Sequence, residues 1–180
     1  MYNRLLRIYK NASHMRTLIS ELLDFRKQEQ GYLKLKVECR DIVAFTKEVY
    51  MSFYEYALKH HIAYRFETSE PSINLWFDPV QMQKVIINLL SNAFKYTPAE
   101  GNITVSIRMH SQQVLLQIKD SGTGIPQESI HKIFDQFYQI DGQRSNLSLG
   151  TGIGLTLSKN IVELHQGNIR VESKVDEGSC

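Results

Sequence analysis

The side chains best suited to chemistry lie in residues 83–98, the segment QKVIINLLSNAFKYTP. If this segment is a helix, Asn88 and Asn92 lie four residues apart on one face. Lys95 and Tyr96 follow one turn later. Carboxamide oxygens suit a hydrated Mg²⁺, an ammonium group suits phosphate, and an aromatic ring suits a purine. Because Asn is a poor helix former and costly to bury alone, the pair either faces water or serves such a ligand.

Two glycine-rich segments further along the chain have the composition of ligand-binding loops. In DSGTGIP, residues 120–126, Asp120 follows a predicted strand and is suited to accept a hydrogen bond from the exocyclic amine of adenine. In GTGIGL, residues 150–155, the glycines leave bare N–H groups at the start of a predicted helix, which favours anion binding. Each motif alone is a weak signal, because turns produce the same spacings. The G-x-G-x-G spacing and the lack of G-x-x-x-x-G-K-[ST] exclude the Rossmann and Walker classes.

The composition of the chain narrows the class of protein. With 42% hydrophobic residues over 180 positions, the chain can bury the core of one ordinary domain. Its 21 basic and 19 acidic residues leave a formal charge of +2, so we expect no binding to nucleic acid. Cys39 and Cys180 fit neither a zinc site nor a disulfide framework, which favours a reducing compartment. No apolar run is long enough to span a membrane and no signal peptide follows Met1, so we expect a cytoplasmic segment.

Residues 1–30 are predicted to form one long helix that stands apart from a globular part at 31–180. The helix carries a narrow apolar seam at alternating three- and four-residue spacing, made of Leu5, Ile8, Ala12, Met15, Ile19 and Leu22. A lone amphipathic helix is unstable in water. We therefore infer that this seam packs against another helix, most simply in a homodimer.

The globular part is predicted to alternate between strands and helices. Asp41 and Asp78 have the positions of helix N-caps, and Pro79 occupies the first turn after the second cap. Residues 141–148 are polar and aperiodic, so we expect a mobile loop there, and a last strand after residue 179 is expected to be missing. The predicted strands are 33–37, 62–66, 73–77, 103–109, 114–119 and 169–173, and the predicted helices are 41–58, 79–96, 127–133 and 150–165.

Four motifs in fixed order carry a resemblance to a known family. N-x-x-x-N-A-x-K-Y, D-x-G-x-G, F-x-x-F and G-x-G-x-G, over residues 84–155, strongly resemble the catalytic ATP-binding domain of bacterial sensor histidine kinases. This resemblance implies an α+β fold, a two-layer open α/β sandwich whose mixed sheet is covered on one face by helices. The same fold is shared with type II topoisomerase, chaperone and mismatch-repair ATPases. Residues 1–30 resemble the second helix of the dimerisation and histidine-phosphotransfer hairpin, including that of hybrid sensor–regulator proteins.

The resemblance also implies roles for individual residues in binding ATP and Mg²⁺. Asn92 and Asn88 would face the metal, and together with Lys95 on the phosphate they form the implied catalytic set. Phe134 and Phe137 would anchor the start of a lid over residues 135–149. The implied ATP-binding residues are Asn88, Asn92, Lys95, Tyr96, Asp120, Gly122, Gly124, Ile125, Phe134, Phe137, Gly150, Thr151, Gly152, Ile153, Gly154, Leu155 and Ser179.

In the families that this chain resembles, the residue at position 88 distinguishes ATP hydrolysis by water from phosphate transfer to a histidine. Members that hydrolyse ATP with water carry a Glu at the position of Asn88, where it acts as a general base. A carboxamide cannot take a proton at neutral pH. The resemblance therefore implies a domain that holds ATP with little hydrolysis until a histidine imidazole reaches the γ-phosphate.

The chain is expected to lack the phosphoacceptor histidine itself. His14, in SHMRTL, matches the family motif H-E-x-R-T-P-L poorly, because Met15 and Leu18 replace its acidic residue and its proline. The remaining histidines, His60, His61, His110, His131 and His165, are expected to have surface roles. The resemblance implies a parent protein anchored in the bacterial inner membrane, whose partners are a second copy, the phosphoacceptor helix and a response regulator receiver domain.

Two other functions remain open on the sequence. The first is a protein serine kinase of the anti-sigma type, which shares the nucleotide motifs but not the long N-terminal helix. The second is a nucleotide-binding module that dimerises through residues 1–30 without activity. The chemical lability of the transferred phosphate distinguishes the first, and failure to bind any nucleotide would favour a degenerate module.

Overall fold

The computed structural model describes residues 33–140 and 151–180, together with positions 9, 12, 15, 16, 19, 22, 23 and 26. The described elements follow the predicted alternation of strands and helices closely. In chain order they are β1 (Glu38–Asp41), α2 (Ile42–Met51), α3 (Tyr54–Lys59), β2 (Ala63–Thr68), β3 (Asn74–Phe77), α4 (Pro79–Tyr96), β4 (Asn102–His110), β5 (Gln113–Asp120), α5 (Gly154–Leu164), β6 (Ser173–Lys174) and β7 (Gly178–Ser179).

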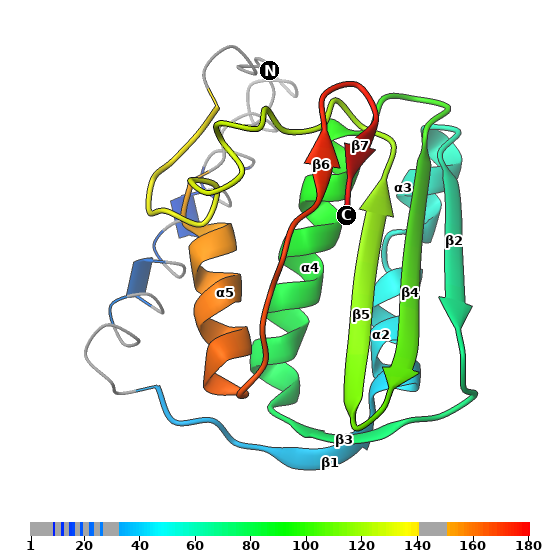
Figure 1. Ribbon diagram of the computed structural model, residues 1–180, viewed down its shortest axis with the longest axis vertical. Helices are drawn as coiled ribbons and strands as arrows, with labels where there is room; N and C mark the ends of the chain where they lie inside the picture. Colours follow the sequence, from blue (N-terminus) through cyan, green and yellow to red (C-terminus); the bar gives the residue numbers. More distant parts are fainter. Residues whose placement is uncertain are drawn as a thin grey trace.

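A five-stranded mixed sheet, in the order β2-β4-β5-β7-β6, organises the domain. β2 runs parallel to β4, and all other neighbours are antiparallel. The helices α2, α3 and α4 lie against one face of this sheet, with α5 beside α4 (Figure 1). β1 and β3 form a separate two-stranded sheet that crosses the end of the domain where α4 begins (Figure 1). This arrangement confirms the predicted α+β sandwich with helices on one face of a mixed sheet.

The central helix of the core is α4, because its apolar stripe is buried on two sides. Ile86 and Leu90 are fully buried in a cluster with side chains of α2, β3 and β4. Val85 is buried in a second cluster with Leu157 and Ile161 of α5. Fully burying one such side chain contributes about 1.5–3 kcal/mol, so the two clusters together fix the rotation of α4 about its axis. The residues on the Val85 side of α4 are thereby turned toward α5.

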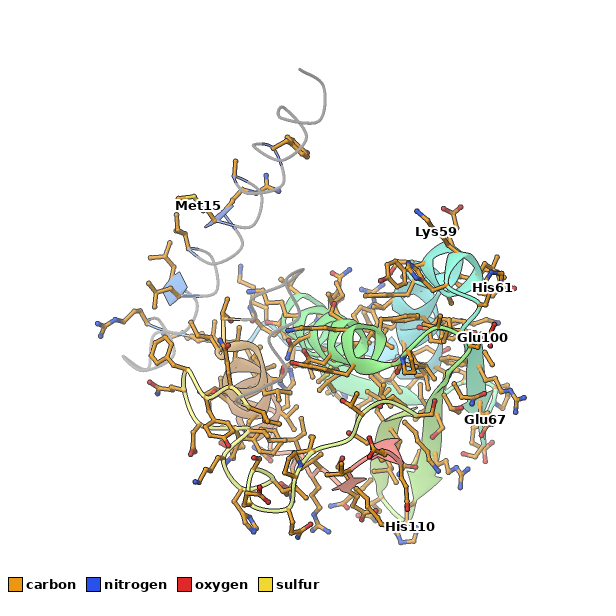
Figure 2. All side chains as sticks on the ribbon, turned by 90° about the horizontal axis from the view of Figure 1, so that it is seen from above. Met15, Lys59, His61, Glu67, Glu100 and His110 are labelled. Carbon is orange, nitrogen blue, oxygen red and sulfur yellow. The ribbon has the colours of Figure 1, made fainter. Side chains whose placement is uncertain are left out.

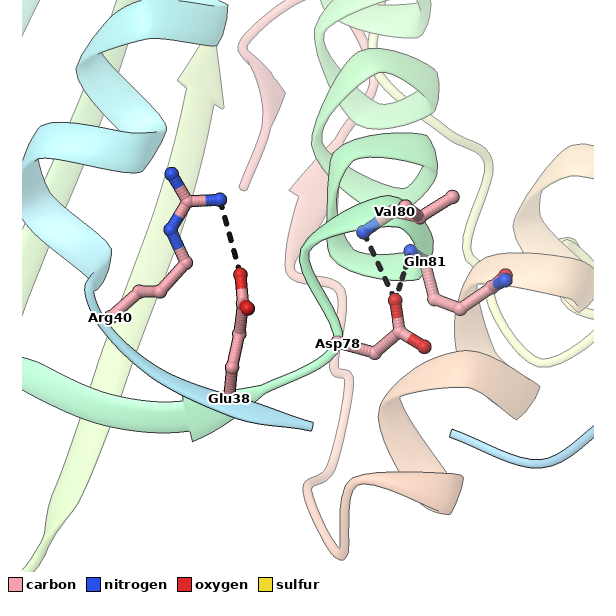
Figure 3. Close-up of polar contacts among 5 residues, drawn as sticks. All are labelled: Glu38, Arg40, Asp78, Val80 and Gln81. Carbon is pink, nitrogen blue, oxygen red and sulfur yellow. Dashed lines mark hydrogen bonds and ion pairs between the residues drawn. The ribbon is translucent and has the colours of Figure 1, made fainter. Parts of the chain in front are cut away.

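The N-terminus of α4 is held by a dense set of hydrogen bonds around Asp78, which confirms the predicted N-cap. Its Oδ1 accepts from the backbone N–H groups of Val80 at 3.0 Å and Gln81 at 3.1 Å (Figure 3). Its Oδ2 accepts from the N–H of Lys36 at 2.8 Å. The N–H of Asp78 in turn donates to Nε2 of His165, whose Nδ1 lies 2.7 Å from the Ile161 carbonyl oxygen. The expected surface role of His165 is therefore wrong: its ring joins the end of α5 to the start of α4.

Two predicted elements near the beginning of the domain are displaced or divided. The first strand is Glu38–Asp41 and not residues 33–37, because its ladder to β3 begins with the pair Glu38–Phe77. The predicted helix 41–58 begins at its Asp41 cap but ends at Met51, and α3 follows after a turn. At that turn the Ser52 hydroxyl donates to the Val49 carbonyl at 2.6 Å. The hydroxyl thus competes with the backbone ladder and ends the helix.

Two predicted elements in the second half are shorter or differently folded. Residues 127–133 form a run of turns instead of a helix, with bonds such as Ser129 N–H to the Pro126 carbonyl. The predicted strand 169–173 is reduced to Ser173–Lys174, because its partner β7 is itself only Gly178–Ser179. Strand length here is set by the neighbouring strand, and the hydrophobic pattern of the segment contains no information about it.

The described positions of the N-terminal segment are all helical and exposed. Four of them belong to the predicted seam, and Met15, which is 61% exposed, lies away from the sheet and its helices (Figure 2). The predicted dimer through this seam stays a prediction. His14, Gly150 and residues 141–149 of the predicted lid lie outside the described residues. Within the described part of the chain, no helix has the length and apolar character needed to cross a bilayer.

Candidate functional site

Asn88 on α4 lies directly against the beginning of α5. Its Nδ2 donates to Oγ of Ser158 at 2.9 Å, and Ser158 is only 2% exposed. A Cβ on Gly154, the first residue of α5, would lie 2.4 Å from Oδ1 of Asn88. The glycine at this position is therefore required by close approach, because any larger residue would displace the carboxamide. The G-x-G-x-G motif and the first Asn of the α4 motif meet in space.

The second half of the α4 motif carries polar groups that are not used to hold the fold. Asn92 is partly exposed, and its carboxamide has no hydrogen bond to another residue in the described part of the chain. The Lys95 ammonium lies 5.0 Å from the centroid of the Tyr96 ring, a cation–π contact. These groups are available to a ligand at the C-terminal end of α4. Their predicted roles toward metal, phosphate and adenine remain predictions.

Asp120 ends β5 and is held from two sides by the backbone. Its Oδ1 accepts from the N–H of Gly122 at 2.8 Å, and Ser179 of β7 is its partner in the sheet. Burial raises the pKa of the Asp120 carboxyl above its ordinary value, and hydrogen bonds from the backbone of Gly122 and Ser179 offset part of this rise. A half-buried carboxylate of this kind is prepared to accept a hydrogen bond from a ligand amine.

The D-x-G-x-G loop is joined to the C-terminal end of α4. The N–H of Thr123 donates to the Tyr96 carbonyl at 3.3 Å. Gly124 has φ +67°, and a Cβ there would lie 2.0 Å from the Lys174 carbonyl oxygen, so the loop also passes at contact distance over β6. The loop, the end of α4 and the beginning of α5 all lie at the same end of the domain (Figure 1).

The F-x-x-F motif is attached to the same end of α5. The N–H of Phe137 donates to the Gly152 carbonyl at 2.9 Å, and the Thr156 hydroxyl donates to the Phe134 carbonyl at 2.9 Å. The Phe137 side chain is 60% exposed, whereas the Phe134 ring lies 5.8 Å from the Lys159 ammonium. Four sequence motifs that span 67 positions, from Asn88 to Gly154, are thus brought around one end of α4 and α5. Whether the two aromatics anchor a lid remains a prediction.

The donor set at this end suits a metal carried by phosphates better than a metal held by the protein alone. In the described ranges there is no group of three His, Cys, Asp or Glu side chains that could hold a metal ion. Mg²⁺ is commonly held by one or two protein oxygens together with substrate phosphates and water. The Asn92 carboxamide, unpaired among the described residues, supplies one such oxygen. Asn88 can supply a second through Oδ1, because its bond to Ser158 uses only the amide nitrogen.

Three residues that support the site were not found from the sequence. Ser158 holds Asn88, Ser173 holds the D-x-G-x-G loop through the N–H of Ile125, and Thr156 holds the F-x-x-F segment. Ser158 lies four residues after Gly154 on one face of α5, a spacing that could have identified it. Ser173 and Thr156 have no comparable signal, because their partners lie 48 and 22 residues away.

Comparison with known proteins agrees with this arrangement. The chain matches the family described as histidine kinase-, DNA gyrase B-, and HSP90-like ATPase over residues 77–180. Histidine kinase P4 of Formosa agariphila is 42% identical, over 99% of this chain and 13% of that protein. The nucleotide-free catalytic domain of the histidine kinase ThkA has a TM-score of 0.71 and 28% identity, over 81% of this chain and 93% of that one. The structure of ThkA in complex with the response regulator protein TrrA has a TM-score of 0.75 and 26% identity. This match covers 96% of this chain and 47% of that one.

The family match covers more than half of the chain. The chain therefore belongs to the histidine kinase-, DNA gyrase B-, and HSP90-like ATPase family. Within that family, the similar histidine kinases identify residues 77–180 as the catalytic ATP-binding domain of a sensor histidine kinase. The chain spans 13% of the length of its Formosa relative, so the activity and partners of the whole protein are matters of proposal.

Proposed function

We propose that this chain binds Mg²⁺-ATP and that the whole protein transfers the γ-phosphate to a histidine in two-component signalling. The observation that carries the proposal is the convergence of the four motifs on one end of α4, where Asn88 meets Gly154 and Tyr96 meets the Asp120 loop. The family match and the resemblance to histidine kinases support it.

In this proposal each motif handles one part of the nucleotide. Asp120 accepts a hydrogen bond from the adenine amine, with Gly122, Gly124, Ile125 and Ser179 forming the surrounding backbone. Lys95 contacts phosphate, and residues 150–155 supply N–H groups to the triphosphate at the start of α5, other than the Ile153 N–H, which donates to Oγ1 of Thr151 at 3.1 Å. Asn92, assisted by Asn88, holds Mg²⁺, which when bound neutralises charge on the phosphates and fixes their geometry.

The proposed reaction is phosphate transfer to a histidine, and it depends on the carboxamide at position 88, where a general base for water would otherwise stand. A histidine nitrogen attacks the γ-phosphorus, the bond from that phosphorus to the β–γ bridging oxygen breaks, and ADP leaves. Water is a poor competitor, because Asn88 cannot act as a base and its amide already donates to Ser158. The site therefore positions the phosphate and waits for the imidazole, which must be brought in from another element.

Nucleotide titration of this chain tests the binding half of the proposal. Calorimetry with Mg²⁺ and a non-hydrolysable ATP analogue should give one saturable site. Asp120→Asn should weaken binding about tenfold or more, because a charge-assisted hydrogen bond worth roughly 1.5–3 kcal/mol is lost. Asp176→Asn removes an exposed acid from the β6–β7 turn and serves as the matched control. Equal affinity in the Asp120 variant and this control would refute the adenine assignment.

The linkage of the transferred phosphate tests the second half. The whole protein, incubated with ATP labelled on the γ-phosphate, should acquire label that is lost in acid and retained in base, as expected for phosphohistidine. Acid-stable label would instead support the serine kinase alternative. An Asn92→Ala variant should acquire no label, which excludes adventitious phosphorylation by contaminants.

The partners of the whole protein complete the proposal. The helical, exposed positions 12, 15, 19 and 22 support a homodimer formed through the N-terminal helix, next to the phosphoacceptor helix. The complex of ThkA with TrrA supports a response regulator receiver domain as the phosphate recipient. Anchoring of the whole protein in a bacterial membrane belongs to the same proposal and is tested by fractionation of cells.

A further inference from the structure

The hydroxyl of Ser173, on β6, lies at the centre of three hydrogen bonds. Its Oγ accepts from the N–H of Ile125 at 2.8 Å and donates to the carbonyl of Gly178 at 2.8 Å. Its third contact is with Oγ of Ser179, also at 2.8 Å. A serine hydroxyl has one proton and two lone pairs, so this one is fully used. One side chain therefore ties the D-x-G-x-G loop to both β6 and β7.

The proton on Ser173 determines the direction of its bond to Ser179. A carbonyl can only accept, so the single proton of Ser173 goes to Gly178. In the contact between the two hydroxyls, Ser179 must then be the donor. Once its proton is used in this way, the Ser179 hydroxyl has only lone pairs left for a ligand. Its orientation as an acceptor is set by Ser173.

Ser179 and Ile125 are also the residues that flank Asp120. Ser179 pairs with Asp120 across the sheet, and its backbone lowers the pKa of the Asp120 carboxyl. Ile125 ends the loop in which Gly122 donates to the same carboxylate. β6 and β7 contain two residues each, and beside them Glu172 and Cys180 exchange two backbone hydrogen bonds at 2.9 and 2.7 Å. The Ser173 hydroxyl adds side-chain hydrogen bonds to this short ladder and links it to the D-x-G-x-G loop.

We propose that Ser173 is a positioning residue that selects the base of the nucleotide. It fixes two neighbouring acceptors, the Asp120 carboxylate and the Ser179 hydroxyl, which match a purine with an amine at position 6. A purine with a carbonyl there would present an acceptor to acceptors, which is unfavourable. This inference rests on the proposed nucleotide site and goes beyond it by assigning base selection to a serine that does not touch the base.

The test compares Mg²⁺-ATP with Mg²⁺-GTP in the full chain. Ser173→Ala should weaken ATP binding about tenfold and leave GTP binding within about threefold, because the freed Ser179 hydroxyl can turn to donate to a carbonyl. Ser173→Thr, which keeps the hydroxyl, should retain the wild-type preference for ATP over GTP. Ser52→Ala removes a serine hydroxyl bond from the turn after α2 and is the matched control. A loss of folding alone would weaken both nucleotides equally.

The outcomes separate this inference from the proposed function. If the wild-type chain binds neither nucleotide, the proposed function fails. If the wild type prefers ATP and folded Ser173→Ala keeps that preference, only the role of Ser173 is refuted. Faster amide exchange at Ile125 in the variant gives an independent readout of the freed loop. If the alanine variant does not fold, Ser173→Cys takes its place with the same outcomes, since a thiol of similar size is a weak hydrogen-bonding group.

Discussion

The two ends of α4 differ in how their polar groups are used. At the N-terminal end, Asp78 engages both carboxylate oxygens and its own N–H, and it connects to Lys36 and His165. At the C-terminal end, the Asn92 carboxamide has no hydrogen bond to another residue in the described part of the chain, and Tyr96 is 36% exposed. The apolar stripe between the two ends is buried along its length. The difference therefore lies in the polar groups and not in the packing.

This contrast shows how one helix can serve stability and binding at once. Hydrogen bonds satisfied within the protein contribute to the free energy of unfolding, whereas unpaired groups on a fixed scaffold are kept for a ligand. The N-terminal end holds β1, β3 and α5 together, and the C-terminal end presents the carboxamides and the lysine. Substitutions at the two ends should consequently separate stability from nucleotide binding.

The largest effect is expected at the stabilising end. Asp78→Ala removes the N-cap, worth about 0.5–2 kcal/mol, and also leaves the N–H of Lys36 unpaired, so the free energy of unfolding should fall by roughly 2–4 kcal/mol. Chemical denaturation measures this loss. At a temperature where the variant is folded, its affinity for Mg²⁺-ATP should equal that of the wild type. A drop in affinity there would show that the two ends are coupled.

Glu38 provides the control for this prediction. Its carboxylate pairs with Arg40 at 3.4 Å near Asp78, but both side chains are about half exposed (Figure 3). An exposed ion pair contributes about 0–1 kcal/mol, so Glu38→Ala should change stability by less than roughly 1 kcal/mol. The same change of acid to alanine thus has a large effect only where the acid caps α4.

The binding end should show the opposite behaviour. Asn92→Ala should weaken Mg²⁺-ATP binding about tenfold or more, because it removes a proposed metal ligand, while the melting temperature of the free protein should not fall, because Ala favours the helix more than Asn does. Calorimetry and thermal unfolding in the absence of nucleotide give the two values. Ser91→Ala, on the exposed side of the same turn, should lower neither the affinity nor the melting temperature. Strong destabilisation by Asn92→Ala would mean that this carboxamide holds the fold and not a ligand.

The sequence was sufficient for features that depend on local rules. The caps at Asp41 and Asp78 and the buried stripe of α4 follow from short-range spacing, whereas the meeting of the motifs was expected only from the family resemblance. It was insufficient where a partner far along the chain decides the outcome. His165 bonds Asp78 across 87 positions and Ser173 bonds Ile125 across 48, and neither histidine nor serine carries a signal of its partner. The break at Ser52 was missed because one hydroxyl outweighed a helical pattern.

A smaller effect is expected where the two helices touch. Gly154→Ala should gain up to about 1 kcal/mol of helix propensity, yet its Cβ would lie 2.4 Å from Oδ1 of Asn88. The carboxamide would have to turn and lose its bond to Ser158, so Mg²⁺-ATP affinity should fall roughly threefold to tenfold without loss of stability. The double variant with Asn88→Ala should bind no more weakly than Asn88→Ala alone. Additive losses in this cycle would show that Gly154 acts independently of Asn88.

The smallest effect concerns the Asp120 carboxyl in the free protein. Burial raises its pKa in the folded state, so the folded protein holds the proton more tightly than the unfolded chain. The stability gained in this way is fully present below the unfolded value of 3.8 and is lost as pH rises through the raised pKa. In the Asp120→Asn variant the carboxamide does not ionise, and its Oδ1 can still accept from Gly122. The melting temperature of this variant relative to wild type should therefore rise from pH about 4 upward.

In saturating Mg²⁺-ATP at neutral pH, the wild type should instead have the higher melting temperature of the two proteins. A ligand raises the melting temperature more for the protein that binds it more tightly. Asp176→Asn, which removes an exposed acid, should show neither the rise nor the reversal. If the Asp120 variant instead loses stability relative to wild type as pH rises, the backbone N–H groups outweigh burial and the carboxylate belongs to the fold. Suppose that the Asp120→Asn variant melts slightly above the wild type without ligand and below it with Mg²⁺-ATP. Asp120 then serves binding, as proposed for Asn92, and its cost to the stability of the free protein is offset by the bound ligand.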